Sequence, residues 1–242
     1  MMDWFEDIQR RLITNFIEQD RWNLVLNGFG VTLKVTFFSV LLGIAIGVLI
    51  AIIRSTHDKN RNEMRTGLGK TFLSVLNFIC KTYLTVIRGT PVVVQLMFMF
   101  FVIFGSSNNK VLVAVLAFGI NSGAYVAEIV RGGIMSIDEG QFEAGRSLGF
   151  NYVQTMRYII IPQTFKVVLP SLANEFIVLL KETSIVGYVA LQDLTRSVDI
   201  IRSRTYDAAI TLTVLALLYL TMVLFFTWLV AKLERRLRDS ER

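Results

Sequence analysis

The residue types that most often perform catalysis or bind metals are scarce in this sequence. The chain of 242 residues contains one cysteine, Cys80, and one histidine, His57. A single residue of each type cannot form a disulfide within the chain or supply a Cys/His metal cluster. Covalent catalysis needs a nucleophile beside a base, and the serines of the apolar segments, such as Ser122, have no paired base in the pattern. The sequence therefore indicates neither a metal centre nor a nucleophilic active site.

One segment resembles the end of a phosphate-binding loop. Gly69, Lys70 and Thr71 follow the order of a loop whose backbone amides wrap phosphates while the lysine reaches the terminal ones. The earlier glycine of that motif would stand at the position of Met64, and no strand is predicted before it. We therefore do not expect this chain to bind ATP itself.

Polar residues inside long apolar segments are stronger functional candidates. A charged group at the centre of a bilayer costs about 2.5–3.5 kcal/mol on insertion scales, so such groups usually face a cavity or one another. The candidates by this rule are Gln95, Asn121, Glu128, Asn174 and Glu175. Glu175 lies well inside its segment, so we expect it to receive the amino or cationic group of a bound molecule.

Three charged residues near the ends of these segments have more than one interpretation. Arg88 can attract a carboxylate or meet lipid phosphates, and a headgroup or structural role is favoured. Glu128 and Arg131 lie near the expected cytoplasmic end of their segment. There they form either a gate or a salt bridge between subunits.

The elements that must position these residues are membrane-spanning helices. The sequence is 53% hydrophobic and 18% charged, which is too apolar for a surface in water. A spanning helix needs about 20 mainly apolar residues, and five segments are predicted, at 31–53, 86–105, 111–131, 158–181 and 208–231. The second should begin irregularly because it contains Arg88 and Pro91. Pro162 and Pro170 permit either a broken fourth helix that lines a cavity or an ordinary kink.

The distribution of basic residues predicts the orientation. Lys and Arg concentrate in cytoplasmic loops, and here they occur at 54–70, in the connection 132–157 and in the tail 232–242. Five crossings then place the N-terminus outside and the C-terminus in the cytoplasm. The connection 181–207 also holds basic residues, which its acidic residues neutralise. The net charge of +6 does not indicate nucleic-acid binding, because the basic residues do not form one face.

The first 26 residues precede the spans. Apolar side chains recur there at near-helical spacing, at Trp4, Phe5, Ile8, Leu12 and Phe16. Residues 1–26 are therefore predicted to form an amphipathic helix on the outer membrane surface, with a solvated tail as the alternative.

Two pairs of glycines lie four residues apart within the spans. Gly43 with Gly47, and Gly119 with Gly123, give flat helix surfaces on which another backbone can approach closely. These surfaces serve either contact between subunits or packing within the chain, and the sequence favours neither.

The connection 132–157 is long and has an unusual content. Residues 140–149 read GQFEAGRSLG, a helix-like stretch that stops at Gly149, and the chain returns to an apolar segment that reaches Pro162. A short helix that protrudes in this way can be held by a soluble protein. A push on it would then move the spans.

At these residues the sequence resembles the permease subunits of ABC importers. Their cytoplasmic signature is Glu-Ala-Ala, three residues, Gly, nine residues, Ile, one residue, Leu-Pro. The residues that match at the required offsets are Glu143, Ala144, Gly149, Ile159 and Pro162. Gly145 replaces the second alanine and Ile161 replaces the leucine, which keeps the small and apolar character of these positions.

Further blocks resemble the polar amino acid branch of that family, the permeases of the histidine, glutamine, arginine and cystine type. They are Arg88-Gly89-Thr90-Pro91, AYVAEIVR at 124–131, Gly140-Gln141-x-Glu143-Ala144, and Asn174-Glu175 followed, after six intervening residues, by Glu182-Thr183-Ser184. The resemblance runs from about Asn27 to the end. It implies an all-α membrane protein with the type I ABC importer permease fold over residues 27–231.

The resemblance also implies partners and a source of energy. Two such permeases, identical or homologous, would form the pore in a bacterial cytoplasmic (inner) membrane. Two ABC ATPase subunits, which carry ATP and Mg, would bind beneath, and an extracytoplasmic binding protein would deliver a polar amino acid. This chain would then be a non-catalytic subunit without a cofactor or metal of its own.

Residue roles follow from the same resemblance. Contact with the ATPase is implied for Gln141, Glu143, Ala144, Gly145, Arg146, Leu148, Gly149 and Pro162. Contact with substrate is implied for the Asn174–Glu175 pair, with Asn121 and Tyr125 nearby. Gln95 and Glu128 remain substrate candidates on the membrane argument given above.

Two other classes of protein were weighed. A self-sufficient secondary amino acid transporter usually shows repeated halves with interrupted helices in corresponding places, and five unequal spans show no such repeat. A membrane scaffold leaves the polar residues of the spans and the loop motif unexplained. The particular amino acid and the choice between a homodimer and a heterodimer stay open, although Glu175 favours a cationic or broadly polar substrate.

Overall fold

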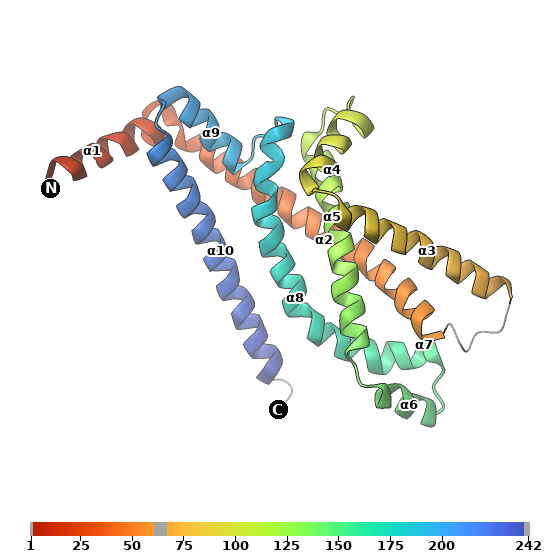
Figure 1. Cartoon of the computed structure of the whole chain (residues 1–242). Helices are drawn as coiled ribbons and strands as arrows, with labels where there is room; N and C mark the ends of the chain where they lie inside the picture. Colours follow the sequence, from red (N-terminus) through yellow and green to blue (C-terminus); the bar gives the residue numbers. More distant parts are fainter. Residues whose placement is uncertain (1, 61–66, 240–242) are drawn as a thin grey trace. The chain divides into compact units, whose positions relative to one another are not determined.

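A computed structural model describes residues 2–60 and 67–239 of the chain, and these ranges contain helices and turns but no strand. Met64 of the rejected phosphate loop lies outside the described residues, as do the basic residues Arg61, Arg65 and Arg242. The predicted all-helical fold is confirmed for the described ranges, and Figure 1 shows the helices in chain order.

The helices follow one another with short connections. The α-helices are α1 (Met2–Leu12), α2 (Trp22–Asn60), α3 (Leu68–Gly89), α4 (Val92–Phe98), α5 (Lys110–Met135), α6 (Glu139–Ser147), α7 (Tyr152–Thr155), α8 (Ile161–Glu182), α9 (Leu194–Thr205) and α10 (Ala208–Asp239). Short π-helical or 3₁₀ segments are η1 (Ile13–Ile17), η2 (Glu18–Asp20), η3 (Met99–Ile103), η4 (Met156–Ile160) and η5 (Thr183–Val189).

In the described part of the chain, four helical stretches are long and apolar enough to cross a membrane. They are Trp22–Lys59, Lys110–Met135, Tyr152–Val189 and Ala208–Arg236. A fifth arises if Leu68–Gly89 and Val92–Ile103 form one broken span. The break falls where irregularity was predicted, since Thr90 is extended and Pro91 follows it. Helix α3, however, reaches back to Leu68, well before residue 86.

The contacts divide the chain into two compact units. The first unit comprises Met1–Ser39, Val93–Phe118 and Ile177–Leu229. The second unit comprises Val40–Val92, Gly119–Phe176 and Val230–Arg242. In the first unit, Leu180, Leu194 and Met222 form a buried cluster against Phe29 and Leu33. This cluster joins α2, α8, α9 and α10.

The N-terminal segment is held on the first unit by a clamp of polar contacts. The Arg11 Nε atom donates to Asp207 Oδ2 at 2.9 Å, and the buried Asn15 side chain donates to the same carboxylate at 2.9 Å. These donors, Arg11 first, lower the pKa of Asp207 to about 2. Trp4 and Phe5 remain exposed, as an amphipathic helix requires.

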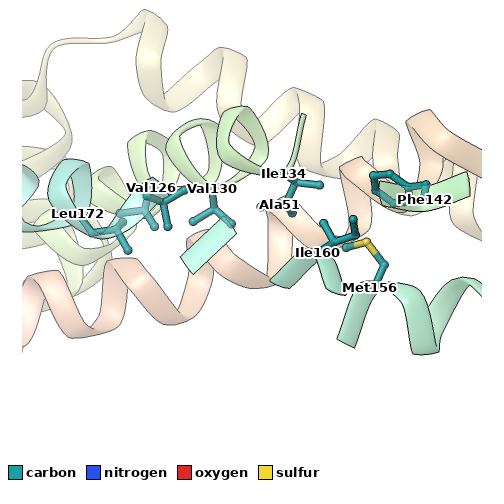
Figure 2. Close-up of a cluster of buried hydrophobic side chains, with 9 residues drawn as sticks. Ala51, Val126, Val130, Ile134, Phe142, Met156, Ile160 and Leu172 are labelled. Carbon is teal, nitrogen blue, oxygen red and sulfur yellow. The ribbon is translucent and has the colours of Figure 1, made fainter. Parts of the chain in front are cut away.

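One apolar cluster of the second unit joins the connection 132–157 to the spanning helices. It comprises Ala51, Val126, Val130, Ile134, Phe142, Met156, Ile160, Val168 and Leu172. Figure 2 shows that side chains of α2, α5, α6, η4 and α8 gather in it. The loop segment α6 and the spanning helices therefore share one core.

Close packing of α2 on α5 explains both glycine pairs. A Cβ atom at Gly47 would lie 2.5 Å from Val126 Cγ1, and one at Gly43 would lie 2.8 Å from Ser122 Oγ. Gly119 and Gly123 face Leu42 and Ile46 of α2 in the same way. Of the two interpretations left open by the sequence, the structure therefore supports packing within the chain.

Candidate functional site

Local sequence signals define both ends of α6. Asp138 caps its start by accepting a hydrogen bond from the Gly140 amide at 2.7 Å. At its end the Gly149 amide donates to the Arg146 carbonyl at 2.9 Å, and the Phe150 amide donates to the Gly145 carbonyl at 3.0 Å. This pair of bonds is a Schellman motif, and Gly149 takes the positive φ of 80° that it needs. The stop predicted at Gly149 therefore has a physical basis.

One face of α6 is anchored and the other is open. Phe142 enters the core of the second unit, and a Cβ atom at Gly145 would lie 2.7 Å from the Thr155 side chain of α7. The small residue at this position is thus needed for close contact. The exposed residues include Gln141, Glu143, Ala144 and Arg146, together with Leu148 just after the helix. Leu148 is 71% exposed, so an apolar side chain faces outward beside charged ones.

A hollow of about 350 Å³ adjoins this face. Its lining includes Asp58 and Lys59 of α2, Glu139, Glu143 and Arg146 of α6, and Tyr152 of α7. The ammonium of Lys59 lies 3.3 Å from the centre of the Phe142 ring, a cation–π geometry. The end of α2 is thus part of the same surface, which the loop motif alone did not reveal.

The chain returns from α6 to the spans through an ordered connection. Asn151 and Gln154 form a capping box at α7, and the π-helical segment η4 leads into α8. Pro162 lies inside the continuous helical stretch Tyr152–Val189, directly after the π-helical segment η4. Gln163 beside it donates to Gln141 of α6 at 3.3 Å. Pro162 therefore lies next to the base of α6, and α8 continues through Pro170.

The candidate substrate residues differ in their exposure. Glu175 is buried and accepts a hydrogen bond from the Ser122 hydroxyl at 2.8 Å. Asn121, next to Ser122, is also buried, whereas Asn174 is exposed. Tyr125 is 39% exposed, with the Arg88 guanidinium 5.7 Å from its ring centre. Gln95 lies on α4 in the first unit and is half-buried.

Glu128 has partners within its own chain. Its Oε1 atom lies 2.7 Å from Arg54 Nη1 and 4.0 Å from Arg88 Nη1. Arg131 pairs with Asp58 at 2.9 Å and lies 3.9 Å from Glu128. Sequence reasoning missed Arg54 and Asp58 as partners. The only available signal was that Arg54 directly follows the first apolar run.

Among residues 2–60 and 67–239, no group of three or more His, Cys, Asp or Glu side chains is placed to hold a metal ion. The polar groups that bring sequence-predicted site residues together are the exposed face of α6, the buried Ser122–Glu175 pair and the charged cluster around Glu128.

Comparisons with known proteins agree with this arrangement. The chain is 34% identical over 220 residues to the arginine transport system permease protein ArtQ of Bacillus subtilis. The aligned region covers 90% of this chain and 94% of ArtQ. It is 34% identical over 210 residues to the glutamine transport system permease protein GlnP of Escherichia coli K12. The aligned region covers 85% of this chain and 90% of GlnP.

Solved structures show the same fold. An amino acid ABC transporter crystallised with histidines matches with a TM-score of 0.77 and 40% identity, over 88% of this chain and 94% of that one. The inward-facing MetNI methionine ABC transporter matches with a TM-score of 0.73 at 18% identity, over 91% and 99%. This second match concerns the fold, which is that of type I importer permeases, as the loop signature implied.

Residues 67–239 match the family of binding-protein-dependent transport system inner membrane components. That range includes α6 with its Schellman motif and the helices α5 and α8, whose core α6 shares, while α2 of the same core precedes it. The relatives are permease subunits of amino acid ABC importers, and the resemblance drawn from the loop signature is confirmed: this chain belongs to the family of binding-protein-dependent inner-membrane transport components.

Proposed function

We propose that this chain is the permease subunit of an ATP-driven importer for a polar amino acid in a bacterial inner membrane. The observation that carries the proposal is α6, a capped helix whose inner face belongs to the core of the second unit while its outer face is exposed. A helix that served only as a connection would not need an anchored side and an open one. The predicted orientation places α6 in the cytoplasm.

The shared core supplies the coupling between α6 and the spans. Phe142 of α6 packs in the same cluster as Ile134 of α5 and Ile160 of η4. Because packed cores resist deformation, a displacement of α6 moves α5 and the start of α8 with it. A partner that grips Glu143 to Gly149 thus acts directly on the spans.

The proposed partners are those that would use the exposed face of α6 and the spans. A separate ABC ATPase, in two copies, would hold ATP and Mg and bind the exposed face of α6. A second permease would complete the pore, and an extracytoplasmic binding protein would deliver the amino acid. The relatives named for arginine and for glutamine support a polar amino acid as the transported substrate.

Within the pore, we assign substrate contact to Glu175 and Asn174 of α8 and to Asn121 and Tyr125 of α5, with Gln95 and Glu128 as further contacts. Glu175 is held by Ser122, so it would receive an amino group only after the helices move. Exposed Asn174 and partly exposed Tyr125 would meet the substrate earlier.

The coupling role of α6 is tested by two substitutions. Gly149→Asp removes the residue that adopts positive φ, and Glu143→Lys reverses a charge on the exposed face. Each is expected to reduce uptake and ATPase association at least about tenfold, a loss of about 1.4 kcal/mol, while membrane insertion persists. Glu234→Lys, an exposed charge reversal on α10, is the matched control. Normal uptake in both α6 variants would remove α6 from the mechanism.

Purification from native membranes in mild detergent tests the assembly. We expect the tagged chain to bring a soluble ATPase with it, and the ATPase activity to rise with one amino acid and its binding protein. A chain that emerges alone and still transports in liposomes would instead be a self-sufficient secondary transporter.

A further inference from the structure

Helix α3 has three distinct faces. One face is buried against α5 through Tyr83, Leu84 and Ile87, and the Tyr83 hydroxyl donates to the Ile120 carbonyl. A second face is apolar but exposed; its residues are Leu68, Phe72, Val75, Phe78, Ile79 and Val86. A third, narrow face between them is polar and includes Lys81, Thr85 and Arg88, which lie at i, i+4 and i+7.

The polar face of α3 opens into a hollow of about 360 Å³. Its lining comprises Arg54 of α2, Glu128 of α5 and five residues of α3, including Lys81 and Arg88. Basic side chains therefore enter this space from two helices. All of its lining belongs to the second unit.

The charges in and around this hollow do not balance. In the described part of the chain, Glu128 and Asp58 face four basic side chains, Arg54, Arg88, Arg131 and Lys81. Within residues 2–60 and 67–239, the buried Arg54 Nε atom has no hydrogen-bond partner, and Lys81 lines this hollow without an ion pair. A surplus of two positive charges at a membrane-spanning protein attracts an anion.

The depth of the hollow indicates which anion. Arg54 directly follows the apolar run 31–53, so it stands where a spanning helix leaves the hydrocarbon region. On the orientation proposed above, this is the level of the cytoplasmic lipid headgroups. Basic pockets between helices on that side suit anionic headgroups, and the exposed apolar face of α3 beside the pocket offers a surface for acyl chains.

We propose that the hollow lined by Arg54, Lys81 and Arg88 binds the phosphate of an anionic phospholipid whose acyl chains lie along the exposed apolar face of α3. Arg54 is held by Glu128 and orients the site, while Lys81 and the half-exposed Arg88 contact the phosphate. The Thr85 hydroxyl already donates to the Lys81 carbonyl. The site is separate from the α6 surface, but it shares Glu128 with the proposed substrate contacts, and Arg88 lies beside Tyr125, another of them.

Native mass spectrometry of the purified full-length chain, titrated with phosphatidylglycerol or with phosphatidylcholine, tests this site. Each basic residue near a membrane surface changes affinity for an anionic lipid about fivefold. Lys81→Gln/Arg88→Gln is therefore expected to weaken phosphatidylglycerol binding at least about fivefold and to leave phosphatidylcholine binding unchanged. Arg157→Gln/Lys166→Gln, which removes the same two types of charge outside the hollow, should bind phosphatidylglycerol like the wild type.

Three results would overturn the proposal. An equal loss of phosphatidylglycerol affinity in both double variants would show that the lipid binds through general surface charge and not in the hollow. Displacement of phosphatidylglycerol by millimolar free arginine or glutamine would assign the hollow to the carboxylate of a transported substrate. Unchanged lipid affinity with a lost dimer mass would assign the face to a second copy of the chain. If the double variant does not fold, Arg88→Lys should retain the affinity and Lys81→Gln alone should lower it.

Discussion

Helices α5 and α10 are both long and apolar enough to cross a membrane, yet the more apolar of them is the less buried. In the spanning window of α5, 67% of residues are buried, against 11% in that of α10. Helix α5 carries Gly119, Asn121, Ser122 and Glu128, whereas the window of α10 is rich in Leu, Val and Phe. In a bilayer, large apolar side chains gain little by leaving lipid, so small and polar residues mark the packed helix.

The largest expected effect comes from filling the contact between α2 and α5. Gly47→Leu places a side chain where even a Cβ atom would lie 2.8 Å from the Ala127 amide nitrogen, so stability should fall by about 3 kcal/mol or more. Thermal unfolding in detergent measures this. Gly30→Leu is the matched control, because a Cβ atom there meets nothing within 4 Å. Equal melting temperatures would show that α2 and α5 do not pack closely.

A smaller effect is expected from the polar contact of α5. Ser122→Ala leaves the buried Glu175 carboxyl without its 2.8 Å donor, which should cost about 1–3 kcal/mol. The same thermal assay applies. On α10, Thr213→Ala removes an exposed hydroxyl that bonds only to the Ala209 carbonyl of its own helix and should cost far less. If the two variants lost the same stability, burial would not explain the difference between the helices.

A buried carboxyl outside the spans tests whether burial itself is the cause. Asp193 is 1% exposed, and burial raises its pKa to about 6. The unfolded chain releases this proton near pH 4. The stabilisation of the folded state by protonated Asp193 is therefore fully present below pH 4 and is lost as the pH rises through 6. Asp193→Asn can still cap α9 and should flatten the stability profile between pH 4 and 7. An unchanged profile would mean that Asp193 does not titrate in this range.

The smallest effect is expected on the outer face of α10. Leu224 is 59% exposed, so Leu224→Ala should change stability by no more than about 0.5 kcal/mol. The measurement is the melting temperature of the chain alone and of the assembled complex. A loss only in the complex would show that another subunit covers this face of α10.

The sequence predicted those parts of the fold and site that depend on neighbouring residues. The stop of α6 at Gly149 and the break before Pro91 were predicted because caps and proline act within a few residues. The apolar runs likewise revealed α2 and α10. The length of α3 was missed, since Lys70, Lys81 and Arg88 interrupt its apolar residues and lower its resemblance to a span.

Contacts between distant residues were not predictable in the same way. Arg54 and Glu128 are 74 residues apart, and a single sequence contains no signal that pairs them. The sequence likewise contains no signal that Gly43 and Gly47 of α2 pack against α5, or that Gly119 and Gly123 of α5 pack against α2. The assignments of substrate contact remain predictions.

The clamp between Arg11 and Asp207 has a consequence for the order of synthesis. The two residues are separated by 196 positions, so at about 5–20 residues per second the ribosome needs roughly 10–40 s to reach Asp207 after Arg11. During that interval Asp207 is not yet available to Arg11, whose other acidic partner is Asp7 of the same helix. The first unit therefore cannot be completed before most of the last spanning helix has been synthesised, and its earliest segment is among the last to be fixed in position.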